Sequence, residues 1–137
     1  MNKYIINIFV GSLSIIIDFL FGGFTMVLQV LLTFMILDYI TGLLTAISSK
    51  SRKTTSGKLS SKAGFKGLCK KFVILLICAV AFQLDKIMGA KNMIYIGVVC
   101  FYCSNEVLSI IENAIALNIP IPNKLKNVIE DLRKEGD

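Results

Sequence analysis

The chain has 137 residues, of which 55% are hydrophobic, and its mean hydropathy is +0.72. A soluble domain of this length cannot bury so much apolar surface, so these values predict an all-α integral membrane protein. The net charge of +6 does not indicate nucleic-acid binding, because eight of the fifteen basic residues lie in the acid-free segment 50–71, as in a loop at a membrane surface.

Two apolar runs open the chain. The first, residues 4–21, provides about 27 Å of helical rise, which is barely enough to cross a bilayer. Without it, the chain has three spans instead of four. The second run, residues 25–47, is longer and carries one ionisable side chain, Asp38, so it spans comfortably. Lys3 precedes the first run as in a signal peptide, but no cleavage pattern follows, so we expect the segment to be retained.

Segment 48–71 is rich in Ser, Thr, Lys and Gly, a composition that does not bury enough apolar area to fold alone. We predict a loop. For its second half two interpretations remain, a continuation of the loop or a short helix at the lipid interface. Because cytoplasmic loops are enriched in Lys and Arg, this segment and both termini are expected to face the cytoplasm. The candidates for contact with anionic lipid are Lys50, Arg52, Lys53, Lys58, Lys62, Lys66, Lys70 and Lys71.

Two more apolar runs follow, at residues 72–88 and 93–119. Only a short turn separates them, so they should be antiparallel neighbours. Pro120 and Pro122 are expected to end the last run, because proline lacks the amide donor and disfavours a helical conformation at the residue before it. Residues 1–119 then form a transmembrane domain.

Residues 120–137 are predicted to form a cytoplasmic tail. Asn123 can cap a helix there. Its apolar residues recur at helical spacing among charges of both signs: Leu125, Val128, Ile129 and Leu132. This pattern predicts an amphipathic helix.

Asp38 lies near the middle of the second run, where an Asp costs about 2.5–3.5 kcal/mol on insertion scales, so it should not face lipid. On a helix it shares one polar and small stripe with Thr41, Gly42 and Thr45. Such a seam joins two helices of one monomer in most polytopic proteins, or it packs one monomer against another. Both interpretations stay open, and the mechanism we expect uses the second.

The last run is amphipathic within the membrane. Six polar side chains project within about one third of the helix circumference: Tyr102, Asn105, Glu106, Ser109, Glu112 and Asn113. No Lys or Arg lies in the central part of any run, so Glu106 and Glu112 are expected to be protonated or in contact with water. We favour a pore lining. The alternative is an internal hydrogen-bond network that only fixes helix packing.

No residue pattern indicates an enzyme, a metal site or a cofactor. Cys100 and Cys103 match a C-x-x-C spacing, but they lie in a continuous apolar helix and the chain has no histidine. Glycine-rich phosphate loops and nucleophile motifs are also missing from the sequence. We therefore expect neither catalysis nor a disulfide framework.

The order of elements between Leu37 and Leu132 resembles the phage-lysis and toxin-secretion holin family. The first matching segment reads LDYITGLLTAI, and a basic loop ending in GFKGLCKK follows it. The C-terminal match, NEVLSIIENAIALNIPIPNKLKNVIEDL, is the more specific half. The matching positions are Asp38, Thr41, Gly42, Gly67, Lys70, Lys71, Glu106, Glu112, Asn113, Pro120, Pro122, Lys124 and Lys126.

This resemblance implies a protein that accumulates in the bacterial cytoplasmic membrane and then assembles with further copies into lesions. Its functional partners are then the lipid bilayer and a lytic enzyme or secreted toxin that the lesions release. One alternative is a small proton-coupled transporter with Glu106 as the coupled site. Another is a non-conducting scaffold or holin antagonist that binds a partner through its tail.

Overall fold

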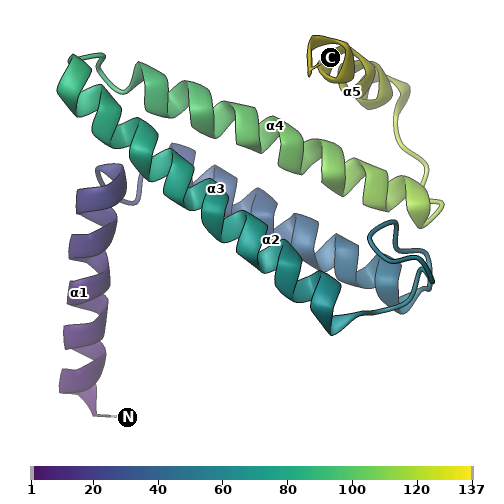
Figure 1. Cartoon of the computed structure of the whole chain (residues 1–137), viewed down its shortest axis with the longest axis horizontal. Helices are drawn as coiled ribbons and strands as arrows, with labels where there is room; N and C mark the ends of the chain where they lie inside the picture. Colours follow the sequence, from purple (N-terminus) through teal and green to yellow (C-terminus); the bar gives the residue numbers. More distant parts are fainter. Residues whose placement is uncertain (1, 137) are drawn as a thin grey trace.

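The computed structural model describes residues 2–136, without the side chains of residues 132, 133, 135 and 136. The predicted helical class is confirmed, because this part of the chain contains helices and no strand. The elements are α1 (Lys3–Phe21), α2 (Met26–Ile47), α3 (Ser61–Met88), α4 (Met93–Ala116) and α5 (Asn123–Gly136) (Figure 1). The first four are long and apolar enough to cross a membrane.

Helices α2, α3 and α4 form a bundle in which α3 runs antiparallel to the other two (Figure 1). The most extensive interface joins α2 to α4, and α3 packs mainly against α4. We call the end where α2 and α4 finish and α3 starts the loop end, and the opposite end the turn end. The half near the turn end holds an apolar core of Leu31, Met35, Cys78, Phe82, Tyr95 and Val99.

Helix α3 begins at Ser61, eleven residues before the predicted start of this span. The Ser60 side chain caps it by accepting a hydrogen bond from the Ala63 amide at 3.4 Å. Residues 61–71 are therefore neither loop nor a separate interfacial helix. Lysine is strongly polar but is also a good helix former. The hydropathy pattern therefore ends at the lysines, whereas the helix continues through them.

The short turn between α3 and α4 is held by a buried acid. The two carboxylate oxygens of Asp85 accept hydrogen bonds from the amides of Ile94 at 3.1 Å and Tyr95 at 2.7 Å. An acidic side chain from α3 thus supplies the N-terminal cap of α4, where Asn92 makes no side-chain cap.

Helix α4 ends at Ala116, three residues before the predicted end of the run. Asn118 adopts a left-handed conformation with φ of 59°, and the amide of Ile119 donates back to the Ala114 carbonyl at 3.0 Å. This C-terminal capping arrangement ends the helix before Pro120 is reached. The predicted tail helix follows as α5, in which Asn123 is the first helical residue.

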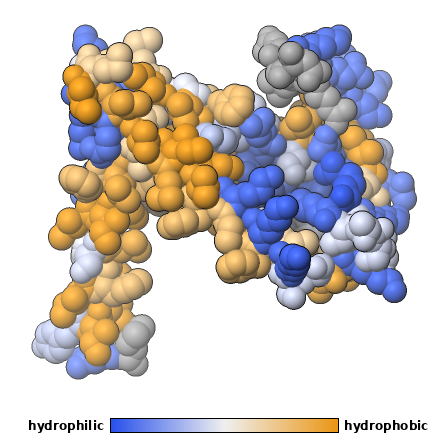
Figure 2. Space-filling view, in the orientation of Figure 1, coloured by the Kyte–Doolittle hydropathy of each residue, from blue (hydrophilic) through white to orange (hydrophobic). Residues whose placement is uncertain are grey.

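Helix α1 leaves the bundle at a steep angle (Figure 1) and has no buried residue. It meets α3 at its C-terminal end, where Lys86 Nζ lies 5.3 Å from the centre of the Phe19 ring and 4.8 Å from that of Phe82. Gly22, with φ of 74°, is required there because an added Cβ would lie 2.6 Å from the Phe82 ring. The exposed surface of α1 is mostly hydrophobic (Figure 2), as lipid contact requires.

Candidate functional site

Three charged side chains meet inside the bundle, one from each of its helices. Lys71 Nζ of α3 donates to Asp38 Oδ2 of α2 at 2.7 Å and to Glu106 Oε2 of α4 at 2.6 Å. The three side chains expose 14%, 6% and 7% of their surface, respectively. Both distances are typical of strong, charge-assisted hydrogen bonds. We call Asp38, Lys71 and Glu106 the charged triad.

The triad forms because all three helices bring a charged residue to the same level. Asp38 lies nine residues from the loop end of α2, whereas Lys71 and Glu106 lie ten residues from the loop ends of α3 and α4. At about 1.5 Å of rise per residue, each is roughly 14–15 Å from its helix end. The groups therefore lie well inside the bundle, where ionisable side chains are stable only when they have partners.

Asn113 connects the triad to the next turn of α2. Its amide nitrogen lies 3.3 Å from Asp38 Oδ1, 3.4 Å from the Asp38 carbonyl oxygen and 2.9 Å from Thr41 Oγ1. Asn113 is only 2% exposed. Its burial is compatible with the apolar surroundings because its polar atoms have partners.

Two small residues let the helices approach at this point. A Cβ added to Gly42 would be in ordinary van der Waals contact with Lys53 Nζ at 3.4 Å and with Asn113 Nδ2 at 3.7 Å, so only a side chain longer than that of alanine would have to displace them. Thr45 is buried and donates its hydroxyl hydrogen to the Gly42 carbonyl at 2.7 Å. The stripe predicted on α2 is therefore a packing seam, and α4 of the same chain occupies it. Packing of a second monomer along this seam stays a prediction, and it requires α4 to leave the stripe first.

An ion pair ties the loop to the same region. Arg52 Nη1 donates to Glu112 Oε2 at 2.8 Å, and Arg52 Nη2 donates to Asn113 Oδ1 at 3.3 Å. Arg52 is thus a partner of α4 in this structure, although the sequence suggested contact with lipid. We call the full set, formed by the triad with Thr41, Gly42, Thr45, Asn113, Arg52 and Glu112, the polar seam.

Although no Lys or Arg lies in the central part of a predicted run, basic side chains from outside the runs reach the acids of the two stripes. Lys71 binds two of them and Arg52 binds Glu112. The spacing along α3 carried a signal for Lys71, because it precedes the buried Cys78 by seven residues and the buried Asp85 by fourteen. Extending the helix backward places Lys71 on this same face. With all three groups ionised, the triad retains one excess negative charge.

The remaining polar residues of the α4 stripe lie at the edge of a groove. This groove of about 1150 Å³ runs between α3, α4 and the loop, and Tyr102, Asn105 and Ser109 line it. Asn105 is exposed, whereas Tyr102 and Ser109 are half-buried. The structure thus divides the predicted stripe. Glu106 and Asn113 point into the seam and Glu112 pairs with Arg52, whereas the other three residues line the groove.

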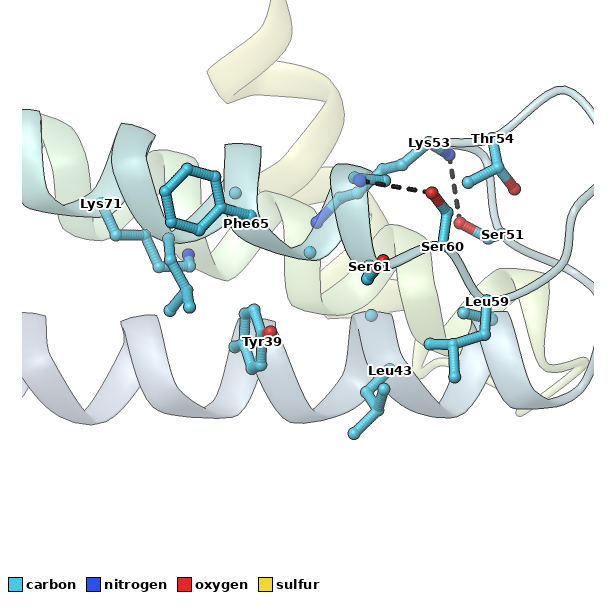
Figure 3. Close-up of a pocket in the computed structure, with 16 residues that line it drawn as sticks. Tyr39, Leu43, Ser51, Lys53, Thr54, Leu59, Ser60, Ser61, Phe65 and Lys71 are labelled. Atoms are coloured by element: carbon cyan, nitrogen blue, oxygen red, sulfur yellow. Dashed lines mark hydrogen bonds between the residues drawn. The ribbon is translucent and has the colours of Figure 1, made fainter.

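Most of the predicted lipid-contact lysines lie on the same groove. Its walls contain Lys53, Lys62, Lys66, Lys70 and Lys71. Lys50 and Lys58 are exposed in the loop and do not line it. A smaller cavity of about 380 Å³ lies between α2 and the first turns of α3 (Figure 3). Lys71 is one of several residues that line both spaces.

Comparison with known proteins points to one family. The model described as "Bacteriophage holin family" matches residues 15–134, which is most of the chain. An uncharacterized protein of Listeria innocua is 38% identical over 127 residues, covering 93% of this chain and 86% of its own length. A second one, from Listeria monocytogenes, is 41% identical over 114 residues, or 83% of this chain and 76% of its own.

Similar chains occur in other bacteria as well. An uncharacterized protein of Clostridium perfringens is 35% identical over 125 residues, covering 90% of this chain and 89% of its own length. No solved structure matches this chain. The family match also extends into α1, which the resemblance noted in the sequence had not covered.

Proposed function

The chain belongs to the bacteriophage holin family, and on this premise we propose that it oligomerises in the bacterial cytoplasmic membrane and opens lesions. Through these lesions a lytic enzyme or a toxin would leave the cell. The observation that supports this proposal best is the polar seam, a set of charged and amide groups inside a bundle whose surface is largely apolar. A helix bundle that only has to fold in lipid needs no such set, because intramembrane ionisable groups are costly.

In the proposed closed state, Lys71 holds the acids of α2 and α4 together. Assembly would separate α4 from α2 and turn Glu106 and Asn113 toward a shared lumen, where water replaces their protein partners. With both acids ionised, the excess negative charge of the triad would favour this exchange, because an unneutralised carboxylate is more stable beside water than inside the bundle. The bundle then has two arrangements of similar energy, as a lesion that opens abruptly requires.

The orientation is part of the proposal. Eight basic residues lie between Lys50 and Lys71, on the loop and the first turns of α3, and they favour a cytoplasmic loop end. Four crossings then leave both termini in the cytoplasm, and α5 on that side as well. Modification of single cysteines introduced at Lys58 and Lys91, with a reagent that does not cross membranes, tests this orientation. Labelling of Lys58→Cys from outside the cell contradicts it.

Purified protein in liposomes tests permeabilisation directly. We expect release of an enclosed dye above a threshold ratio of protein to lipid, with a delay that shortens as this ratio rises. Release that decreases with dye size would measure the opening. Intact liposomes at every ratio would favour the non-conducting scaffold or antagonist. Transport of protons without dye release would favour the proton-coupled transporter.

Glu106 offers a test within this experiment. Glu106→Leu leaves Lys71 and Asp38 as a neutral pair and removes a polar group from the proposed lumen, so insertion should persist while dye release is delayed or lost. Glu106→Gln is the matched control for shape, because it keeps a polar side chain and removes only the charge. We expect an intermediate delay for this variant. If both variants release dye with unchanged timing, Glu106 has only a packing role.

A further inference from the structure

The groove between α3, α4 and the loop has the features of a ligand site. Its volume of about 1150 Å³ lies in the range of small-molecule sites or slightly above it. Four of its lysines do not belong to the charged triad: Lys53, Lys62, Lys66 and Lys70. Three of these lie four residues apart on α3, so they follow one another along the same side of the helix.

These lysines are not neutralised by the protein. The two acids that border the groove, Asp38 and Glu106, are both bound by Lys71. Among the side chains that the structure describes, none of the other four lysines makes an ion pair with an acid. Hydrophilic residues gather over this end of the bundle in Figure 2, opposite the apolar turn end. Four lysines exceed the one excess negative charge that the triad carries when all its groups are ionised, so the groove keeps a net positive charge that attracts an external anion.

The groove also has an apolar wall. Val73 and Ile74 line it just beyond Lys70, on the side of α3 that leads toward the turn end, and Val73 is 51% exposed. Tyr102 of α4 borders the same space. A free anion would use the lysines alone, whereas a ligand with an anionic head and an apolar tail would contact both parts.

We propose that this groove is a binding site for one anionic phospholipid, whose phosphate lies between Lys66 and Lys70. One of its two acyl chains runs along Val73 and Ile74 toward the bilayer centre. The site differs from general attraction to a charged surface, because basic pockets between transmembrane helices hold single headgroups. This inference requires insertion in the membrane with the loop end at a headgroup layer, and it does not depend on lesion formation.

Native mass spectrometry of the full chain in detergent tests the proposal. Titration with phosphatidylglycerol should give a one-to-one adduct at concentrations at least about tenfold lower than titration with phosphatidylcholine. Equal binding of the two lipids overturns the proposal, because phosphatidylcholine has no net charge. Competition with inorganic phosphate distinguishes the two sources of the anion. Displacement of the lipid by micromolar phosphate would mean that the groove selects a soluble anion.

The chain offers a matched pair of variants. Lys66→Gln with Lys70→Gln removes two charges from the groove, whereas Lys50→Gln with Lys58→Gln removes two charges from the loop outside it. A lysine near an anionic headgroup contributes about a fivefold change in affinity. We therefore expect the groove variant to weaken phosphatidylglycerol binding by roughly twenty-fold and the loop variant by less than about twofold. Equal losses of affinity in both variants would mean that lipid binding depends on net charge alone, which overturns the proposal of a specific site.

Discussion

The two halves of the bundle are held together in different ways. Near the turn end, the contact between helices is an apolar core that includes Leu31, Cys78 and Val99, each fully buried. Near the loop end, the same helices are joined by the charged triad and by Asn113. One half relies on packing and the other on charge and hydrogen bonds.

This difference matters because lipid is apolar. An apolar core has little preference for another helix over acyl chains, so the turn end is stabilised by close packing alone. The polar half cannot exchange its partners for lipid, but it can exchange them for water. The loop end is therefore the half in which a second, hydrated arrangement of the helices is accessible, while the turn end keeps α3 and α4 together.

Among the variants of the two halves, removal of Lys71 should have the largest effect on the free energy of unfolding. Lys71→Met leaves two acids buried without their cation, and breaking a buried ion pair in this way costs about 3–5 kcal/mol. We expect this loss in the free energy of unfolding, measured in mixed micelles, together with earlier dye release from liposomes. Lys58→Met is the control, because the exposed Lys58 lies outside the groove and makes no ion pair with a described residue. Equal stability of the two variants contradicts a role for the triad.

A compensated variant separates charge from packing at the same place. Adding Asp38→Asn and Glu106→Gln to Lys71→Met removes all three charges, and replacing a whole buried ionic group is often close to neutral for stability. We expect recovery of most of the lost free energy of unfolding without recovery of normal release timing. Recovery of both properties would show that the charges have no part in opening.

The turn end should respond to cavity formation instead. Leu31→Ala removes a side chain that is 0% exposed, and such truncations cost about 2–4 kcal/mol when the site does not collapse. The matched control is Leu43→Ala on the same helix, where the side chain is 40% exposed. We expect the first variant to lower the free energy of unfolding in micelles, with no dependence on salt. A loss as large in Leu43→Ala would mean that the core is not the stabilising contact.

Asn113 should have a smaller effect within the polar half. Asn113→Leu removes the contacts with Asp38 and Thr41, and hydrogen bonds between membrane helices contribute about 0.6–2 kcal/mol. Asn105→Leu, at an exposed position on the same helix, serves as the control. Unfolding in micelles should show the loss only in the first variant. Equal values for both would indicate that Asn113 is tolerated in the seam without stabilising it.

Much of this fold could be predicted from the sequence, because lipid imposes a simple rule on helix length and polarity. The four apolar helices followed from hydropathy, and the shared stripe of Glu106 and Asn113 followed from helical projection. The partners of these residues did not follow. Asn113 and Asp38 are 75 residues apart in sequence, and only tertiary packing brings them together.

Lys71 shows most clearly why the site could not be predicted completely from the sequence. It is one of four lysines in the first half of α3, and together they indicated a membrane-facing surface. Only Lys71 points into the bundle; the other three are Lys62, Lys66 and Lys70. Composition does not reveal which one, whereas the register of the helix does, since Lys71 lies seven residues before the buried Cys78. The prediction was wrong because hydropathy marks only where the hydrophobic residues begin, at Phe72, whereas the helix begins at Ser61.

The smallest predicted effect concerns the link between the loop and the polar half. Arg52 is 46% exposed and Glu112 25% exposed in their side chains, so the pair is screened by water and salt. Arg52→Gln should change the free energy of unfolding by only about 0.2–1 kcal/mol, less at high salt. Hydrogen exchange of the amides in residues 50–57 should nevertheless accelerate, because Arg52 fixes the loop to α4 through two hydrogen bonds. Lys58→Gln, in the same loop without an ion pair to a described acid, is the control. Faster exchange in Arg52→Gln with unchanged timing of dye release would place the loop outside the closed-state contacts, whereas earlier release would make it part of them.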